Sequence, residues 1–383
     1  LLYALDVTDP ESPVMKWRKS SLENGYSELG QTWSKPVVTK LKVGTDDKIV
    51  LMMGLGYDPD VDDGPSVTRT QGRGVIVIDA LTGEDIWQVT SGSVSSPSGT
   101  VLSEANMTFS VPSDLAVVDR DGNGYSDRVY FGDTGGQLWR LDIASATVAD
   151  WKATRLFKFS TSPQRFLNAP DVVESPDGNY DMIIIGSGDR EKPVDTSVQN
   201  YMIFYRDYDQ TRAATSTTTL TEDDLAEATT VVSGSTEAFD PDTDITTNSK
   251  FLKGWYLTLE EGEKVVTSVL TTNEVATFAT NIPGQNNDCT DLGEARIYKI
   301  NPFSVVGRAP GDKNYVTVGG GGFLPSPVGF TVIIEERICD ADNNCTIEEK
   351  AVSGVMFGFH AEDTEGDPLG VRRRVWWYSK QDK

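Results

Sequence analysis

Oxygen-bearing side chains, most of them acidic, occupy every second position in one short stretch of the chain. The stretch is DRDGNGYSD at 119–127, in which Asp119, Asp121 and Asn123 alternate and Tyr125 and Asp127 continue the series. Calcium takes six to eight oxygen ligands at about 2.3–2.6 Å, and a tight loop with alternating carboxylates supplies them. Carboxylates this close repel one another without a cation between them. We therefore expect one Ca²⁺, bound by the side chains of Asp119, Asp121, Asn123 and Asp127 and by the backbone carbonyl oxygen of Tyr125.

The loop differs from an EF-hand in its last ligand and in its flanks. Gly124 stands at the sixth position, where an EF-hand turns sharply, but Tyr130 replaces the bidentate glutamate at the twelfth. The flanking segments LAVV and RVYFG are apolar and predict strands. The pattern therefore predicts a calcium loop at a β-hairpin, and the alternative is a simple polar Asp–Gly turn.

Two weaker acidic clusters have the same spacing. Asp58, Asp60 and Asp62 in DPDVDDG lack a glycine at the sixth place, and the stretch 340–344 has Cys345 there. The first cluster predicts a solvated loop in preference to a second ion site, and the second predicts a surface hairpin.

The elements that must position these residues are short strands arranged in a repeat. A Ser/Ala-x-Pro or Pro-x-Val phrase opens each unit, and an apolar strand that ends at glycine follows. The openings are SKPVV at 34–38, SVPSDLAVV at 110–118, NAPDVV at 168–173 and LPSPVGF at 324–330, and the strands end at Gly54, Gly132, Gly186 and Gly358. Several strands per unit are typical of propeller blades, which bury their faces by stacking radially. We expect an all-β chain, a modified β-propeller over residues 1–383 with five recognisable blades; a pair of β-sandwich domains is the alternative.

The start of the chain and its charge bear on its origin. The sequence opens inside the strand-like phrase LLYALDV without an initiator methionine or a signal peptide, so we expect a fragment whose N-terminal part is missing. No apolar run approaches the ~18 residues of a membrane span.

The net charge of −24 repels phosphate backbones, so a nucleic-acid partner is not expected. It suits an exported protein that meets cations, although a solvated acidic surface explains most of it.

Two segments interrupt the repeat. Residues at about 211–250 are rich in Thr, Ser and Asp and predict an exposed insertion, within which Thr221 is a candidate helix N-cap. The acidic segment at about 335–350 predicts a hairpin closed by a disulfide between Cys339 and Cys345, which implies export; two reduced thiols are the alternative. Cys289 is left without an assigned partner.

Catalytic patterns are weak. His360 is the only histidine, so any Ser-His or Cys-His scheme must pass through it. The glycine run 319–322 precedes neither a helix nor a Lys-Ser/Thr pair, so it is no phosphate loop. We therefore expect a protein that acts by binding, not an enzyme.

Longer phrases resemble known propellers. GRGVIVIDALTGEDIWQV at 72–89 resembles a quinoprotein blade through Asp79, Thr82, Gly83 and Trp87, although the adjacent cysteines of many quinoproteins are absent. Nearly the whole chain resembles the C-terminal propeller of PilY/PilC-type proteins, the type IV pilus biogenesis factors and tip adhesins. The phrases that carry this resemblance are MMGLGYDPD, DRDGNGYSDRVYFGDTGGQLWRLDI, IIIGSGDRE, GWYLTLEEGEKVVTSVL and RRRVWWYSK.

The resemblance implies a function by binding. It implies one calcium ion in the 119–127 loop, control of pilus extension and retraction, and adhesion, in an exported protein at the pilus tip or outer membrane. Minor pilins or other pilus components, and a host or abiotic surface, are the implied partners. A quinoprotein-like enzyme and a carbohydrate-binding propeller are the alternatives, which added quinone cofactor and a glycan array would reveal. The adhesion ligand and the blade face that binds it stay open.

Overall fold

The computed structural model describes residues 1–62, 70–92, 96, 98–161, 163–208, 218–228, 249–284, 292–304, 314–319, 321–339, 345–357 and 360–363. Within these ranges the chain is almost entirely β-strand. Helix is limited to one turn of α1 (Pro59–Asp62) and short 3₁₀ turns. No helix in the described part of the chain is long and apolar enough to cross a lipid bilayer. The all-β prediction is confirmed.

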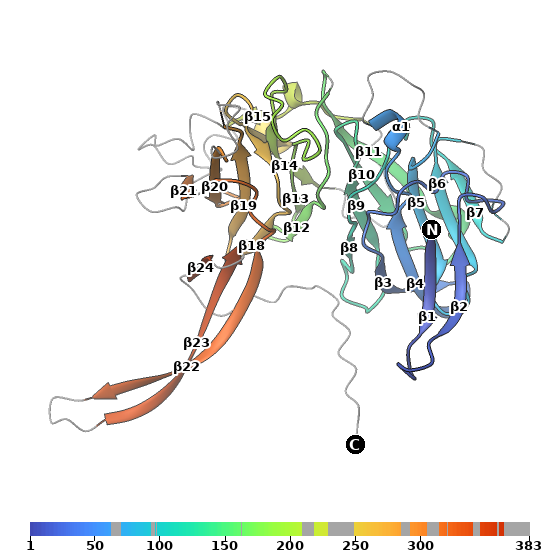
Figure 1. Cartoon of the computed structure of the whole chain (residues 1–383), viewed down its shortest axis with the longest axis horizontal. Coiled ribbons are helices and arrows are strands. Elements are labelled where there is room, and N and C mark those ends of the chain that lie inside the picture. Colours follow the sequence, from blue (N-terminus) through green and yellow to red (C-terminus); the bar gives the residue numbers. More distant parts are fainter. Residues whose placement is uncertain are drawn as a thin grey trace.

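Four sheets of four or five strands follow one another along the chain (Figure 1). The first blade contains β3 (Val37–Val43), β4 (Asp46–Gly54), β5 (Gly74–Asp79), β6 (Asp85–Thr90) and β7 (Thr100–Ser103). The second contains β8 (Ala116–Val118), β9 (Arg128–Gly132), β10 (Gln137–Asp142) and β11 (Lys152–Lys158). The third contains β12 (Asp171–Glu174), β13 (Asp181–Gly186), β14 (Tyr201–Asp207), β16 (Gly254–Thr258) and β15 (Ala226–Glu227). The fourth contains β17 (Lys264–Val265), β18 (Leu270–Thr272), β19 (Val275–Ile282), β20 (Glu294–Ile300) and β21 (Tyr315–Val318).

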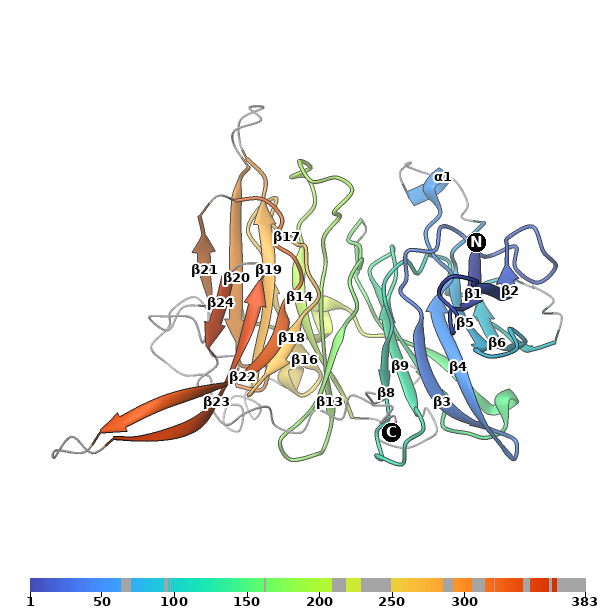
Figure 2. The same ribbon diagram turned by 60° about the horizontal axis from the view of Figure 1, so that its bottom comes forward.

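The first strands of successive sheets lie next to one another. Strand β12 contacts both β8 and β18, and β18 contacts β22 (Val328–Cys339), which opens a three-stranded sheet with β23 (Cys345–Phe357) and β24 (His360–Asp363). The sheets therefore stack side by side in chain order (Figure 2), and β8, β12, β18 and β22 are the inner strands along which they meet. This radial stacking of small antiparallel sheets is the architecture of a β-propeller.

The hydrophobic core lies between blades, and side chains alternate across each sheet. In β13, Ile183 and Ile185 pack with Leu138 and Phe157 of the second blade. The intervening Met182 and Ile184 belong to a separate core shared with the fourth blade. Successive strand residues point to opposite faces, so each sheet needs a neighbour on both sides. Full burial of such side chains contributes about 1.5–3 kcal/mol each.

The glycine that ends the second strand of a blade is required by the next blade. A Cβ at Gly132 would lie 2.3 Å from the Cβ of Phe166, five residues before β12. A Cβ at Gly54 would lie 2.2 Å from the carbonyl oxygen of Val111, and one at Gly186 would lie 2.4 Å from a methyl carbon of Val265. Val111 and Val265 also stand five residues before an inner strand. The repeated glycines in the sequence therefore mark contacts between blades.

The leading strands have the register of a blade's outer hairpin. Strands β1 (Leu2–Asp6) and β2 (Val14–Lys19) place Trp17 opposite Ala4, as β5 and β6 place Trp87 opposite Val77, and the register shifts after each of these pairs. The indole N–H of Trp17 donates to the carbonyl of Ala80 at 3.0 Å, which attaches this hairpin to the first blade.

The insertion at about 211–250 is described only at 218–228 and 249–250. In the first of these parts some polar residues are exposed, as expected, whereas the apolar residues are buried. Leu225 and Ala226 are 1% exposed, and β15 adds in parallel to β16. A 3₁₀ turn at Glu222–Asp224 follows Thr221, as the sequence predicted. Leu225 thus packs between the second and third blades, and Ala226 packs between the third and fourth.

The acidic segment at 335–350 includes the expected hairpin. Strands β22 and β23 pair up to Cys339 opposite Cys345 and extend away from the blades (Figure 1). The register is compatible with a disulfide, which remains a prediction. Cys289 lies outside the described residues.

Candidate metal centre

The loop 119–127 connects the two inner strands of the second blade, β8 and β9. It brings together three carboxylates: oxygens of Asp119, Asp121 and Asp127 all lie within 4.8 Å of one another. Two oxygens bound to one Ca²⁺ at about 2.4 Å can be at most about 4.8 Å apart, so this spacing fits a single cation. Asp119 and Asp127 are buried, whereas Asp121 is exposed.

Backbone amides orient Asp119 inside the loop. Its Oδ1 accepts N–H bonds from Gly122 at 2.8 Å and Asn123 at 3.1 Å, and its Oδ2 accepts one from Gly124 at 2.8 Å. Gly122 and Gly124 have φ of +69° and +89°, a left-handed conformation that favours glycine. The two glycines therefore fold the backbone around the first carboxylate, as the turn predicted at Gly124 requires.

Asp127 closes the loop and is also part of the hairpin framework. Its Oδ2 accepts N–H bonds from Arg120 at 2.8 Å and Asp121 at 3.2 Å. Its backbone N–H donates to Val118, and its carbonyl accepts from Ile143. Asp127 thus has a structural role in addition to any ligand role.

The remaining predicted ligands lie on the exposed side of the loop. Asn123 donates its N–H to Asp121 Oδ1 at 3.1 Å, and its own Oδ1 accepts the N–H of Tyr125 at 2.8 Å. The described geometry places Asn123 in the same turn as the carboxylates. The role of the Tyr125 carbonyl remains a prediction.

The second half of the loop is attached to the first blade. The Tyr125 hydroxyl donates to Asp47 at 2.9 Å, and the ammonium of Lys40 lies 4.7 Å from the Tyr125 ring centre. Next to it, the hydroxyl oxygens of Ser126 and Thr39 are 2.6 Å apart. Asp47 also pairs with Lys40 and Lys42, and these contacts lower the pKa of its carboxyl to about 2, led by the hydrogen bond from Lys42.

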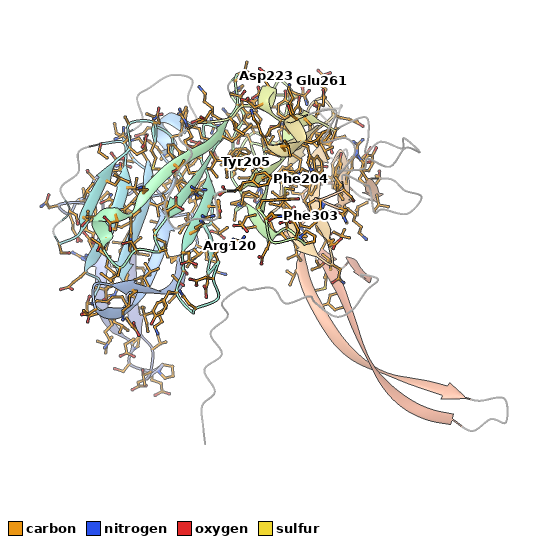
Figure 3. All side chains as sticks on the ribbon, turned by 180° about the vertical axis from the view of Figure 1, so that it is seen from behind. Arg120, Phe204, Tyr205, Asp223, Glu261 and Phe303 are labelled. Atoms are coloured by element: carbon orange, nitrogen blue, oxygen red, sulfur yellow. The ribbon has the colours of Figure 1, made fainter. Side chains whose placement is uncertain are left out.

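The first half of the loop is attached to the third blade through Arg120 (Figure 3). Its guanidinium contacts Glu174 at 2.9 Å and Asp181 at 3.2 Å, and it donates to the carbonyl of Gly178. Arg128, directly after the loop, lies 3.8 Å from the same Asp181 carboxylate oxygen. One side chain of the third blade is therefore contacted from both ends of the acidic loop.

Behind Asp181 lies a buried group of charges between the second and third blades. Arg140 pairs with Asp207 at 2.8 Å and with Asp142 at 3.1 Å, and Tyr130 donates its hydroxyl to Asp207. Burial raises the pKa of Asp181 to about 6. Burial also raises the pKa of Asp142. Because removing one partner would leave a buried charge unpaired, a single substitution in this group should destabilise the junction of the two blades.

The weaker acidic clusters do not form a comparable group among the described residues. The Asp58 carboxylate is buried and accepts N–H bonds from Thr70 and Gln71, so it organises its own loop. Asp60 is exposed. Residues 340–344 lie outside the described part.

A groove runs along the inner strands next to the candidate metal centre. Its volume is about 1330 Å³, and it is lined by residues of β3, β8, β12 and β18. Asp119, Arg120 and Ser126 line it from the loop, and Glu174 and Asp181 line it from the third blade. The loop contacts therefore border the axis of the propeller.

Sequence reasoning found the carboxylates but not the two attachments of the loop. The spacing of Asp119, Asp121 and Asp127 is local, so it could be recognised directly. The partners of Arg120 and Tyr125 are more than 50 residues away in the chain. The available signal was an arginine and a tyrosine placed inside an otherwise acidic and polar loop.

Comparisons with known proteins agree with this architecture. No family model matches the chain. A type IV pilus biogenesis factor PilY1 homolog of Xylella fastidiosa is 27% identical over 346 residues, covering 83% of this chain and 22% of the relative. The type IV pilus biogenesis factor PilY1 of Pseudomonas aeruginosa is 26% identical over 363 residues, covering 79% of this chain and 29% of the relative. The chain thus spans less than a third of the length of these relatives.

The fold comparison points to the same domain. The crystal structure of the C-terminal domain of Pseudomonas aeruginosa PilY1 superposes with a TM-score of 0.62 and 18% identity, over 95% of this chain and 79% of that one. At this identity the superposition establishes the fold alone. The resemblance seen in the sequence is confirmed to this extent: the chain has the propeller fold of the PilY1 C-terminal domain, and its sequence is similar to relatives named PilY1 over most of its length.

Proposed function

We propose that this chain is the calcium-binding propeller of a type IV pilus biogenesis factor. The observation that carries the proposal is the group of three carboxylates, Asp119, Asp121 and Asp127, whose oxygens lie within the span of one calcium ion. Oxygen donors at this spacing suit a hard divalent cation, whereas zinc prefers nitrogen and sulfur ligands. Asn123 and the Tyr125 carbonyl complete the donor set, with water in the remaining positions.

The pilus role rests on the relatives. The two relatives described above are named type IV pilus biogenesis factors. We infer that this chain acts at the cell surface, at the pilus tip or outer membrane, by binding minor pilins or other pilus components and a host or abiotic surface. In this proposal calcium occupancy favours pilus extension over retraction.

Calcium titration of the purified domain by calorimetry tests the ion site. We expect one ion per chain, with a dissociation constant between about 10⁻⁶ and 10⁻³ M. Asp121→Asn should abolish binding, because it removes the charge of an exposed candidate ligand. Asp9→Asn is the matched control, since Asp9 is exposed and accepts an N–H bond in a turn of the β1–β2 hairpin. Binding that is unchanged in Asp121→Asn would exclude this site.

The pilus role is tested in the bacterium that encodes the chain. The Asp121→Asn substitution is introduced into the full-length protein, and surface pili and twitching motility are scored beside Asp9→Asn. We expect altered piliation with a normal level of the protein. Normal piliation and motility in a variant with no calcium binding would remove the regulatory role and leave the ion site intact.

A further inference from the structure

We propose that calcium in the 119–127 loop couples the first, second and third blades, with Tyr125 and Arg120 as the two positioning residues. The proposal rests on the calcium site proposed above and adds what that site controls. The observation is that the loop is attached to a different neighbouring blade on each side. Tyr125 reaches the β3–β4 turn, and Arg120 reaches the β12–β13 turn.

Both attachments depend on the conformation of the loop. Tyr125 N–H is held by Asn123, and the N–H of Arg120 is held by Asp127, so each positioning residue is oriented by a predicted ligand of the cation. Without a cation the carboxylates repel one another, and the loop opens most easily on its exposed side. Such an opening changes the direction in which the side chains of Tyr125 and Arg120 point.

The contacts made by the two residues are specific to their side chains. Arg120 uses three different nitrogens of its guanidinium for Glu174, Asp181 and the Gly178 carbonyl. A lysine keeps the charge but cannot reproduce this fork. Phenylalanine in place of Tyr125 keeps the ring near Lys40 and removes only the hydroxyl that donates to Asp47.

Coupling between the ion and the attachments must be reciprocal. If calcium strengthens the contacts of Arg120, then loss of those contacts weakens calcium binding by the same factor. Arg120→Lys should therefore weaken calcium binding about fivefold, a modest coupling. If residue 120 affected the ion only through its charge, Arg120→Lys should leave calcium affinity unchanged, because lysine retains the positive charge. The conservative variant thus separates the two explanations.

Hydrogen–deuterium exchange of the domain, with CaCl₂ and with a chelator, tests the proposal. In the wild type, calcium should slow exchange in the 119–127 loop and also in the turns 43–47 and 174–181. Arg120→Lys should lose the calcium effect in 174–181 and keep it in 43–47. Tyr125→Phe should give the reverse pattern. Arg155→Lys is the control, because Arg155 lies in β11 of the same blade and hydrogen-bonds to Gln137 away from the loop.

The outcomes distinguish this inference from the proposed function. Calcium binding with slower exchange in the 119–127 loop alone would overturn the coupling and leave the ion site standing. Loss of the calcium effect in both turns in each single variant would overturn the assignment of one attachment to each residue. A wild-type domain that binds no calcium would overturn both proposals.

Discussion

The Arg120 guanidinium lies 3.2 Å from the Asp181 carboxylate and joins the acidic loop of the second blade to the second strand of the third. Asp181 is 2% exposed, and burial raises the pKa of its carboxyl from 3.8 to about 6 despite the two arginines beside it. The folded protein therefore holds this proton more tightly than the unfolded chain does. Ionising Asp181 costs stability, so its contribution to stability is largest at low pH and falls as pH rises from about 4 to 6.

We predict that Asp181→Asn flattens the pH dependence of stability in this window. Asparagine cannot ionise, so the cost of charging a buried carboxyl, at most about 3 kcal/mol at this pKa, disappears from the variant. The free energy of unfolding in urea is measured at pH 4.5 and 6.5, with a chelator present, for wild type and variant. The stability of wild type relative to the variant should be lower at pH 6.5 than at 4.5. An equal difference at both pH values would show that Asp181 titrates normally.

Asp127 and Asp121 should differ in the metal-free protein although both are candidate ligands. Asp127 is buried and accepts two backbone N–H bonds, whereas Asp121 is exposed. Asp127→Ala leaves those donors without an acceptor and should cost about 1–3 kcal/mol in the presence of a chelator. Asp121→Ala should change stability by less than about 0.5 kcal/mol. Urea unfolding of the two variants checks this, and equal losses would contradict the structural role of Asp127.

Local patterns in the sequence predicted most of the fold, and their failures have a physical cause. The glycines that end β4, β9 and β13 could be recognised in the sequence because a side chain at any of these positions would clash with the next blade. The fourth blade was not recognised because it has no opening phrase of the repeat and its strand β19 ends at Ile282, where the others end at glycine. There the Asn281 side chain donates to the Gly322 carbonyl at 3.1 Å.

The candidate site shows the same division between local and distant information. Alternate aspartates and two glycines specify the loop within nine residues, which made it predictable. The buried face of the insertion was not predictable in this way, because Leu225 and Ala226 are few among polar residues. Leu225 is buried between the second and third blades and Ala226 between the third and fourth, and only the assembled fold creates these interfaces.

Cys339 and Cys345 should form a disulfide in the exported protein. Their positions are register partners at the end of the β22–β23 hairpin. The closed loop is short, so the stabilisation in the chain-entropy picture is about 2 kcal/mol or less. Peptide mapping without reductant should recover the two cysteines in one cross-linked peptide. A peptide that links Cys289 to either of them would contradict this pairing.

Substitution of Gly132 should destabilise the junction between the second and third blades. A Cβ there would approach the Phe166 side chain to 2.3 Å, and overpacking of a core costs about 1–3 kcal/mol. Gly132→Ala should lower the free energy of unfolding by this amount. Gly319→Ala is the control, because its Cβ would meet nothing within 4 Å and its change should stay within about 0.5 kcal/mol.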